Sequence, residues 1–324
     1  MSNRLTKMIN YISYNKRFAI LLLVFLGSCG VPKSDYETLK EENENLKKEL
    51  TELHSKINEI QYLKNHSEVA LTNTELLELA SSYTGQKYKI KIKLPRGYEK
   101  GTEKYPVLYV TDAETNFGGV SYIVQRLIKD KLIPPILVVG IAYGTDYRTF
   151  YSLRSRDLTP TEDKNLRMGG KVDPTGGADN FSRFLKNELF PFIQENYRVR
   201  KENRALFGHS YGGLYGCYVF LNQPELFNKY LLLSPSLWYD DYILLSMVKN
   251  TDLLLRPTKL FLASGKLEGR IDTLQVNFVN SLKTKDLRNL SLKSEVLENE
   301  THRTIFGPGF TDGLRFIYKD YENQ

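Results

Sequence analysis

The chain contains, at residues 207–213, the sequence Phe-Gly-His-Ser-Tyr-Gly-Gly. Residues 204–207 before the serine favour a short buried strand, and the apolar residues 214–221 after it favour a helix. A serine with glycines two positions before and after it, between a strand and a helix, is the pattern of a nucleophile elbow. Larger side chains would collide with the strand and the helix at so sharp a turn. We therefore expect the Ser210 hydroxyl to be exposed at the carboxyl end of a sheet.

Length and charge limit the kind of protein. The 324 residues suffice for one large α/β domain and an appendage. The net charge of the whole chain is +7, but the first 28 residues contain four basic residues and no acid. Without them, 41 Lys and Arg stand against 38 Asp and Glu, and the net charge is +3. This balance is not that of a nucleic-acid-binding protein, so no nucleic-acid partner is expected. The two cysteines, Cys29 and Cys217, do not amount to a disulfide framework.

The first 29 residues have the layout of a bacterial export signal. Residues 1–17 are polar and basic, residues 18–26 are apolar, and the segment ends in Leu-Gly-Ser-Cys. The apolar run is too short to span a bilayer as a helix but suits the core of a signal peptide. The ending resembles the lipobox of bacterial lipoproteins, whose cysteine is acylated. The resemblance implies a signal peptide over residues 1–28, a lipid on Cys29, and a membrane-anchored envelope location facing the periplasm or the cell surface. An ordinary secretory signal is the alternative.

Residues 35–63, after a short tether over residues 29–34, form a heptad repeat. They are rich in Glu, Lys, Leu and Asn and contain no Gly or Pro. The a positions are Tyr36, Asn43, Leu50 and Ile57, and the d positions are Leu39, Leu46, Leu53 and Ile60. A polar Asn at one a position with Leu at most d positions favours a parallel two-stranded coiled coil, which predicts a homodimer through residues 36–60. A single solvated helix between the membrane and the domain is the alternative.

Residues 64–81 are predicted to be a linker, and residues 82–324 an α/β domain. Strand patterns alternate with helical patterns along this domain, which predicts a mostly parallel sheet with helices on both faces. Residues 87–94 alternate lysine with apolar residues, as an antiparallel edge strand does. Residues 144–177 are the longest irregular stretch, and such an insertion usually borders a functional site. Strands are expected at 87–94, 106–110, 136–141, 204–207, 230–233, 259–263 and 290–297, and helices at 122–131, 180–196, 214–221, 242–248, 271–283 and 314–318.

A serine hydroxyl at neutral pH needs a general base within hydrogen-bond reach. The chain has four histidines. His54 lies in the heptad segment and His66 in the linker. His209 adjoins Ser210 on a turn that sends consecutive side chains in different directions. His302 remains, directly after the last strand and therefore at the same carboxyl edge of the sheet, so it is the predicted base.

The acid of the triad is expected on the loop after the penultimate strand, in the order serine, acid, histidine. Glu268 follows the strand at 259–263 and is the predicted acid, which would hold the His302 tautomer and stabilise its protonated form. Asp272 is the runner-up, inside the following helix. Glu300 is close to His302 in sequence, but strand alternation directs it elsewhere. Such a triad requires neither a cofactor nor a metal.

Acyl transfer also requires hydrogen-bond donors for the developing oxyanion. One expected donor is the backbone N–H of Tyr211, directly after the nucleophile. The other is expected on the loop after the strand at 106–110, where the N–H groups of Ala113 and Glu114 are the candidates.

Residues 82–324 resemble a bacterial esterase family of α/β-hydrolases that includes esterase D, siderophore esterases, feruloyl esterases and mycolyltransferases. The resemblance rests on seven segments in the family's order: 105–112, 140–143, 156–160, 208–213, 234–238, 265–268 and 300–302. It implies an α/β-hydrolase fold, the triad Ser210, Glu268 and His302, and an oxyanion donor from the loop at Glu114. Two departures matter. The family often has Asp-Gly where this chain has Asp112-Ala113, and many members carry Asp as the acid.

These features predict a serine esterase that acts on a small-molecule ester, with siderophore esters and plant-phenolic esters as the two candidate classes. Trp238 is a candidate for stacking on an aromatic acyl group, or else a packing residue. Arg154 and Arg156 are candidates for contacts with an anionic substrate, or else anchors of the loop through carboxylates. The same triad would serve an acyltransferase. A catalytically inactive binding or assembly lipoprotein of the envelope is the alternative of a different class.

Overall fold

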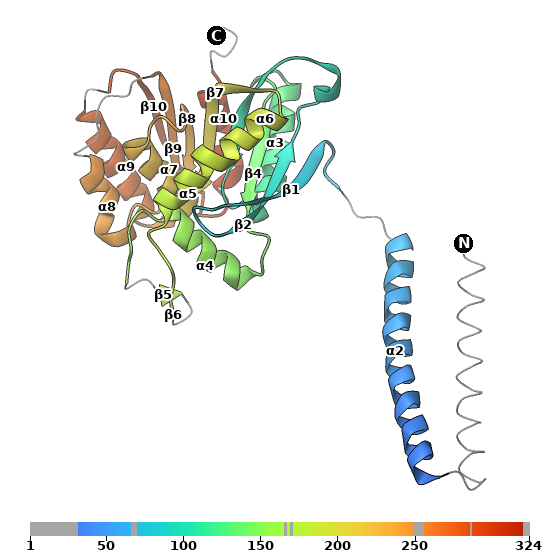
Figure 1. The fold of residues 1–324 in the computed structure, drawn as a ribbon. Coiled ribbons are helices and arrows are strands. Elements are labelled where there is room, and N and C mark those ends of the chain that lie inside the picture. The colour runs from blue at the N-terminus through green and yellow to red at the C-terminus, as the bar shows by residue number, and fades with distance from the viewer. Residues whose placement is uncertain are drawn as a thin grey trace. The chain divides into compact units, whose positions relative to one another are not determined.

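In the computed structural model of the protein, the chain forms two compact units, residues 1–70 and residues 71–324. The structure describes residues 32–65, 70–164, 167–168, 171–248, 256–285 and 287–319 (Figure 1). The predicted signal peptide and the predicted lipid site at Cys29 lie outside the described residues. No helix within the described ranges is long and apolar enough to cross a membrane.

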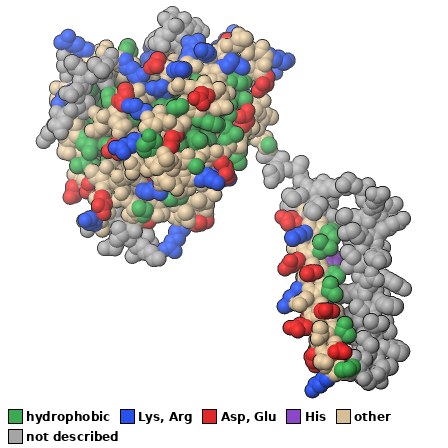
Figure 2. Space-filling model, in the orientation of Figure 1, with side chains coloured by type: hydrophobic (Ala, Val, Ile, Leu, Met, Phe, Trp, Pro, Cys, Tyr) green, Lys and Arg blue, Asp and Glu red, His purple; other side chains and the backbone are tan. Residues whose placement is uncertain are grey.

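The described part of the first unit is the helix α2 (Lys33–Asn65). It covers the predicted heptad repeat, so the prediction of an N-terminal helix is confirmed. Apolar side chains gather along one side of α2 (Figure 2). The d-position residues Leu39, Leu46 and Leu53 are 37%, 56% and 41% exposed. The single chain leaves these leucines open to solvent, and the pairing of two chains stays a prediction.

The second unit is built on an eight-stranded sheet with the order β1-β2-β4-β3-β7-β8-β9-β10. The strands from β4 to β10 in this order run parallel, whereas β1 and β2 are antiparallel to their neighbours. The strands are β1 (Thr74–Ala80), β2 (Lys87–Lys93), β3 (Tyr105–Val110), β4 (Leu137–Ala142), β7 (Val199–His209), β8 (Lys229–Leu233), β9 (Thr258–Gly265) and β10 (Leu290–Leu297). The predicted mostly parallel sheet is confirmed. Its central strands are continuous apolar runs because they are covered on both faces.

Helices cover both faces of the sheet, as predicted (Figure 1). One apolar core lies between the sheet and the helices α3 (Ala113–Lys129) and α10 (Phe306–Ile317). The core on the other face lies under α4 (Tyr147–Leu158), α5 (Ala178–Phe184), α6 (Phe190–Asn196), α7 (Tyr211–Asn222), α8 (Tyr239–Val248) and α9 (Ile271–Lys283). A π-helical segment (Leu185–Leu189) joins α5 to α6, so the helix expected at 180–196 is continuous but not regular.

The sheet begins earlier than the sequence indicated. β1 lies inside the predicted linker over residues 64–81 and pairs with β2 along its whole length. The linker prediction is therefore wrong over this strand, and β2 is not the edge of the sheet. β1 packs one face on the core through Leu77 and Leu79, while Leu76 is 63% exposed. An edge strand with one packed face and two glutamates gives a weak sequence signal.

The insertion at 144–177 is more regular than predicted. It contains α4 and two short antiparallel strands, β5 (Arg167–Met168) and β6 (Lys171–Val172). Asp146 caps α4 by accepting hydrogen bonds from the N–H groups two and three residues later (3.0 and 3.2 Å). Most of the α4 sequence is polar or charged, so its helical periodicity is hard to recognise.

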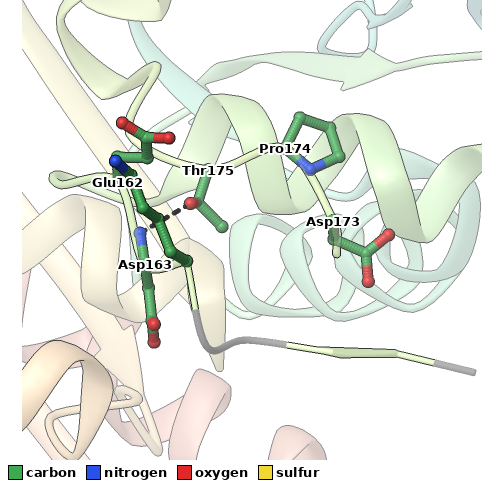
Figure 3. Close-up of a pocket in the computed structure, with 6 residues that line it drawn as sticks. Glu162, Asp163, Asp173, Pro174 and Thr175 are labelled. Carbon is green, nitrogen blue, oxygen red and sulfur yellow. Dashed lines mark hydrogen bonds between the residues drawn. The ribbon is translucent and has the colours of Figure 1, made fainter. Parts of the chain in front are cut away.

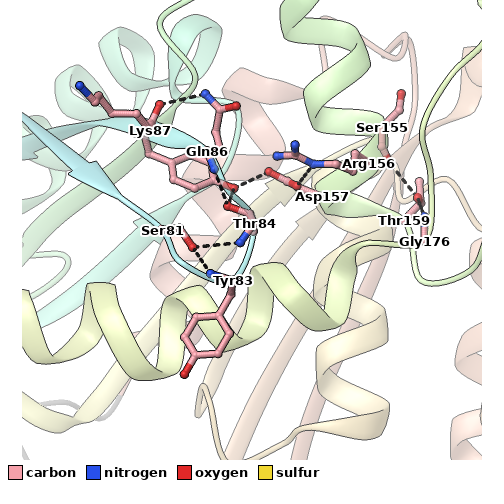
Figure 4. A network of polar contacts seen from close by, with 11 residues as sticks. Ser81, Tyr83, Thr84, Gln86, Lys87, Ser155, Arg156, Asp157, Thr159 and Gly176 are labelled. Carbon is pink, nitrogen blue, oxygen red and sulfur yellow. Dashed lines mark hydrogen bonds and ion pairs between the residues drawn. The ribbon is translucent and has the colours of Figure 1, made fainter.

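A buried carboxylate fastens α4 to the sheet (Figure 4). Asp157, which is 1% exposed, accepts a hydrogen bond from the Tyr88 hydroxyl on β2 (2.6 Å) and pairs with the Arg156 guanidinium (2.7 Å). Burial raises the pKa of Asp157, and these two donors oppose the rise. Just after α4, the Thr159 hydroxyl accepts a hydrogen bond from the Gly176 N–H (2.8 Å). The part of the insertion between residues 159 and 176 is thereby closed at its base.

Candidate active site

Ser210 lies at the turn between β7 and α7, as the elbow pattern predicts. Its backbone has φ 60° and ψ −117°, a conformation that non-glycine residues rarely adopt and that costs on the order of 1–3 kcal/mol. Neighbouring segments hold the turn. The Ser210 N–H donates to the Leu233 carbonyl at the end of β8 (3.0 Å), and the Ser210 carbonyl accepts from the Leu214 N–H (2.9 Å). A strained serine between a strand and a helix is the geometry of a nucleophile elbow.

Three glycines make this turn possible. A methyl group at Gly208 would overlap the carbonyl of Gly212, and one at Gly212 would overlap the hydroxyl of Thr111. A methyl group at Gly213 would lie 2.9 Å from the Pro235 Cα. The glycines therefore let α7 start close to β7 and to the loops after β3 and β8. Those loops are brought to the serine as a result.

His302 and Glu268 lie in contact at the same edge of the sheet. The His302 Nδ1 is 2.6 Å from the Glu268 Oε2. Glu268 ends a short helical turn after β9 (Lys266–Glu268), and His302 follows β10, the neighbouring parallel strand. The Leu267 N–H donates to the Glu300 carbonyl (3.0 Å), which joins the two loops. Residues 34 positions apart in sequence are thereby held side by side.

The two alternative acids have other contacts. Asp272 lies in the first turn of α9 and pairs with the Lys266 ammonium (2.8 Å). Glu300 takes part in the loop contact through its backbone carbonyl. Of the three candidates, Glu268 is the one that the structure brings to His302.

The Glu268 carboxylate is buried and well supplied with donors. Its side chain is 0% exposed. Besides His302, it accepts hydrogen bonds from the Ser234 hydroxyl (2.6 Å) and from the Gly265 N–H. Burial raises the pKa of Glu268, but its three hydrogen bonds outweigh burial and hold the pKa below its usual range. The carboxylate is therefore ionised at neutral pH and faces one nitrogen of the imidazole.

The imidazole of His302 stacks against His209. The two ring centroids are 4.5 Å apart with an interplanar angle of 39°, so His302 lies against the residue that precedes Ser210. Among the described residues, no hydrogen bond joins His302 to Ser210, and the Ser210 Oγ lies 3.5 Å from the Ser236 Oγ. Catalytic hydrogen bonds in the absence of substrate are often long and shorten when substrate binds. The structure thus brings the predicted base, His302, and the predicted acid, Glu268, into contact next to the elbow.

Two helices begin beside the elbow. α7 begins at Tyr211 and α3 at Ala113, the latter nine residues before the start that the sequence predicted. They follow β7 and β3, which are adjacent parallel strands. The first N–H groups of a helix have no acceptor within the helix, and the helix dipole places partial positive charge there. Both helix starts are therefore suited to hold an anion.

Glu114 is the other candidate oxyanion donor on this loop, and its carboxylate is hydrogen-bonded to a neighbouring loop. The carboxylate accepts hydrogen bonds from the N–H groups of Tyr143 and Gly144 on the loop after β4, the latter at 3.1 Å. Burial raises the pKa of Glu114, and these two bonds, together with one from its own N–H, oppose the rise. Glu114 therefore ties two loops at the carboxyl edge of the sheet to each other.

A buried ion pair between Asp112 and Arg154 holds the loop after β3. The Arg154 Nε and Nη2 each lie 2.8 Å from an oxygen of Asp112, and the guanidinium lies 5.1 Å from the centroid of the Tyr211 ring. Burial lowers the pKa of Arg154, but the charge and the hydrogen bonds of Asp112, with smaller contributions from Tyr143 and Tyr151, together outweigh burial and raise the pKa above its usual range. Asp112 itself has φ 52°, directly before α3. The pair therefore fixes the turn from which Ala113 emerges.

Arg154 and Arg156 have the contacts of loop anchors, which was the alternative to the predicted substrate contacts. Arg154 is paired with Asp112 and Arg156 with Asp157. Each guanidinium charge is already matched by a buried carboxylate, so neither arginine offers an unmatched cation to an anionic substrate.

Trp238 is the predicted substrate residue that remains accessible. Its side chain is 40% exposed, and its ring centroid lies 6.2 Å from that of Tyr211. The indole therefore presents an apolar face next to the elbow.

A cavity of about 420 Å³ lies in the insertion (Figure 3). It is lined by residues 162–164 and 173–175, and the Asp163 N–H donates to the Thr175 hydroxyl across it (2.9 Å). Burial raises the pKa of Tyr211 to about 12, and the charges of Asp163 and Asp173 add to the rise. Within the described part of the chain, no three His, Cys, Asp or Glu side chains are grouped as metal ligands.

Two serines make contacts that the sequence analysis did not assign. Ser234 donates to Glu268, and Ser236 approaches Ser210. Both belong to the segment 234–238 after β8, and Ser234 has φ 42°. Their position after a strand that ends beside the elbow was the signal available in the sequence.

Comparisons with known proteins find that the chain is similar to esterases. Residues 81–304 match the family model described as "Putative esterase". Ferri-bacillibactin esterase BesA from Bacillus subtilis is 35% identical over 213 residues, which cover 61% of this chain and 72% of that protein. Siderophore triacetylfusarinine C esterase from Aspergillus fumigatus is 29% identical over 189 residues, which cover 56% of this chain and 62% of that protein. The crystal structure of an IroE-like serine hydrolase from Shewanella oneidensis superposes with a TM-score of 0.68 at 28% identity, covering 76% of this chain and 81% of that one.

We expect His209 to make the stability of the domain depend on pH. Burial, followed by the neighbouring His302, lowers the pKa of His209 to about 4, whereas an unfolded histidine titrates near about 6.5. At a pH between these two pKa values, His209 binds a proton in the unfolded state but not in the folded state. The stabilising contribution of neutral His209 is therefore complete above the unfolded pKa and is lost as pH falls toward the folded pKa, by up to about 1.4 kcal/mol per pH unit. Urea unfolding of the wild type and of His209→Gln between pH 7 and pH 4 measures this difference.

His54→Gln, a histidine replacement on α2, is the matched control and should keep the wild-type slope of stability against pH. If the stability of His209→Gln changed with pH as steeply as that of the wild type, His209 would not be the cause of this pH dependence.

Proposed function

Because the chain belongs to the "Putative esterase" family, it is a carboxylic ester hydrolase, and we propose that Ser210, His302 and Glu268 are its catalytic triad. The observation that carries the proposal is the 2.6 Å contact between the His302 Nδ1 and the Glu268 Oε2 beside the strained serine. An ionised carboxylate on Nδ1 favours the tautomer whose Nε2 lone pair accepts a proton. It also stabilises the imidazolium that forms when the serine proton is transferred.

In the proposed reaction, the Ser210 Oγ attacks the ester carbonyl carbon while its proton moves to the His302 Nε2. The carbonyl electron pair passes to its oxygen and forms a tetrahedral oxyanion. The bond to the alcohol oxygen then breaks, and His302 returns the proton to the leaving alcohol. Water adds to the acyl-enzyme by the same route and releases the carboxylic acid, which restores Ser210 and His302. An alcohol in place of that water would give acyl transfer by the same steps.

We assign the oxyanion donors to the N–H groups of Tyr211 and Ala113. Each is the first residue of a helix that starts beside the elbow. Of the two candidates for the second donor we choose Ala113, because it is the first residue of α3 and directly follows the turn at Asp112. Loss of one such donor typically lowers kcat by about 100- to 1000-fold. The Asp112–Arg154 pair supports this assignment because it fixes the turn before Ala113.

We propose siderophore esters as the substrate class. The two relatives described above are named for the hydrolysis of siderophore esters. The exposed indole of Trp238 supports an aromatic acyl group, since offset stacking on an indole contributes about 0.5–1.5 kcal/mol beyond the burial of area. The arginines do not contribute to this assignment, because carboxylates already neutralise them.

Ser210→Ala is expected to remove nearly all hydrolysis of p-nitrophenyl acetate and p-nitrophenyl butyrate. The expected loss in kcat/KM is about a thousandfold or more, because the variant has no nucleophile. Glu268→Gln is expected to lower kcat by about 10- to 1000-fold with a smaller effect on KM, since His302 loses its ionised partner. Release of p-nitrophenolate, followed by its absorbance, measures both variants.

Glu300→Gln is the matched control, an amide replacement on the neighbouring loop, and it should keep the wild-type rates. Equal rates for the wild type and Ser210→Ala would instead favour a binding module without catalysis. The substrate class is tested with the same enzyme on a catecholate trilactone siderophore and on methyl ferulate. A higher kcat/KM on methyl ferulate would contradict the siderophore assignment.

We also propose that Cys29 is acylated and anchors the protein in a bacterial envelope. The Leu-Gly-Ser-Cys ending after a basic and apolar segment supports this. In a bacterial host that matures lipoproteins, the purified chain is expected to begin at a lipid-modified Cys29 and to sediment with membranes. Cys29→Ser should lose the lipid and leave the membrane fraction. Intact mass spectrometry of both proteins checks this, and an unacylated mature N-terminus in the wild type would contradict it.

We propose that α2 pairs with α2 of a second copy in parallel. The exposed d-position leucines support pairing because they form an apolar stripe at heptad spacing. Residues 30–324 are expected to sediment as a dimer, and Leu46→Glu with Leu53→Glu should shift them to monomer. Asn45→Glu with Ser55→Glu, which adds the same charge outside the a and d positions, is the control and should stay dimeric. A wild-type monomer at high concentration would rule out pairing.

A further inference from the structure

A second cavity, of about 830 Å³, lies at the amino ends of the parallel strands, opposite the edge that carries Ser210. Its walls come from the start of β1, the end of β2 with the loop that follows, and the last turns of α3. The register places it at this edge, because Lys93 at the end of β2 pairs with Val138 near the start of β4. It shares no lining residue with the candidate active site.

Lys93 is the unusual member of this lining. It is 8% exposed, and its ammonium donates to the Thr72 carbonyl. Burial lowers the pKa of Lys93. Two carboxylates also line the cavity. Among the residues that the structure describes, however, no carboxylate forms an ion pair with Lys93. The Glu75 carboxylate instead accepts a hydrogen bond from the Tyr197 hydroxyl (2.6 Å). A buried ammonium without a counter-charge is costly, and an anion in the cavity would remove that cost.

The remaining lining combines further positive charge with an apolar floor. Arg96, Lys100 and Lys129 stand around the cavity and are exposed to solvent. Four basic residues therefore face two acidic ones. Four apolar residues complete the lining, namely Leu94, Val124, Ile128 and Ile136, and are called its floor below. A ligand that fits both features carries a negative charge at one end and a hydrocarbon segment at the other.

We propose that this cavity binds an anionic amphiphile, with the head group on Lys93 and one hydrocarbon chain over the apolar floor. The head group is a monoanion, because one buried ammonium is available to match it. A free fatty acid and an anionic lipid of a membrane share this chemistry. The proposal does not depend on the esterase activity, since the site and the triad lie at opposite edges of the sheet.

Titration calorimetry with dodecanoate below its micelle concentration tests the site. The wild-type chain from residue 30 is expected to bind one dodecanoate, and Ser210→Ala should bind it equally well. Lys93→Met is expected to weaken binding by about 10- to 100-fold, the range for loss of a charge-assisted hydrogen bond. Lys87→Met, on the same strand but with a side chain that is 64% exposed, is the matched control and should bind as the wild type does. Dodecanol and dodecyltrimethylammonium should bind more weakly than dodecanoate.

A second variant separates loss of the site from loss of the fold. Ile128→Trp keeps Lys93 and fills the floor, so it is also expected to weaken dodecanoate binding at least tenfold. Thermal unfolding of each variant shows that the fold is intact, and Lys93→Met should be no less stable than the wild type because it removes a buried charge. Dodecanoate binding that neither variant weakens, or no saturable binding by the wild type, would overturn the proposal.

The two sources of the ligand are distinguished by flotation with phosphatidylglycerol vesicles. Flotation that depends on Lys93, with weak binding of monomeric dodecanoate, identifies the lipid surface as the source. Binding of monomeric dodecanoate that depends on Lys93, without flotation, identifies a free fatty acid. Flotation that is the same for the wild type and Lys93→Met, with no dodecanoate binding, shows only general attraction to an anionic surface and contradicts a built site.

Discussion

The Glu268 carboxylate accepts hydrogen bonds from three parts of the chain, and the geometry around Ser210 depends on it. A carboxylate with no exposed area is stable as an anion only if donors replace its water. Ser234, Gly265 and His302 supply them from the loop after β8, the last residue of β9 and the loop after β10. The same bonds fix where those loops stand. The low pKa of the acid and the position of the imidazole therefore have one physical cause.

The other side of the serine is organised by the same principle. The Asp112 carboxylate is buried after β3, and the Arg154 guanidinium from the insertion satisfies it with two bonds of 2.8 Å. Residues 42 positions apart are thereby joined. Since Asp112 adopts a left-handed backbone directly before α3, the ion pair holds the strained turn that precedes Ala113. Two buried carboxylates, one on each side, thus keep His302 and the proposed oxyanion donor in place around Ser210.

Sequence patterns predicted the parts of this arrangement that depend on local geometry or on strand order. The glycines around Ser210 predicted the turn because only they fit it. The parallel order of β9 and β10 predicted that Glu268 and His302 would meet at one edge of the sheet. β1 was missed because an edge strand packs only one face, and α4 because its helical face is polar. The role of Ser234 was also missed, and the anchoring role of Arg154 was anticipated without its partner, Asp112. Their partners are distant in sequence, so no local pattern connects them.

Buried charge also distinguishes the two edges of the sheet. At the carboxyl edge each buried carboxylate near Ser210 has donors from other segments of the chain, whereas the Lys93 ammonium at the amino edge has one backbone carbonyl as its partner. α3 runs between these edges, since it begins at Ala113 and its last turns line the second cavity. Its 17 residues correspond to a rod of roughly 25 Å. A helix packed on the sheet along its length holds its two ends in a fixed relation. The serine site and the cavity therefore differ in chemistry but share one rigid support.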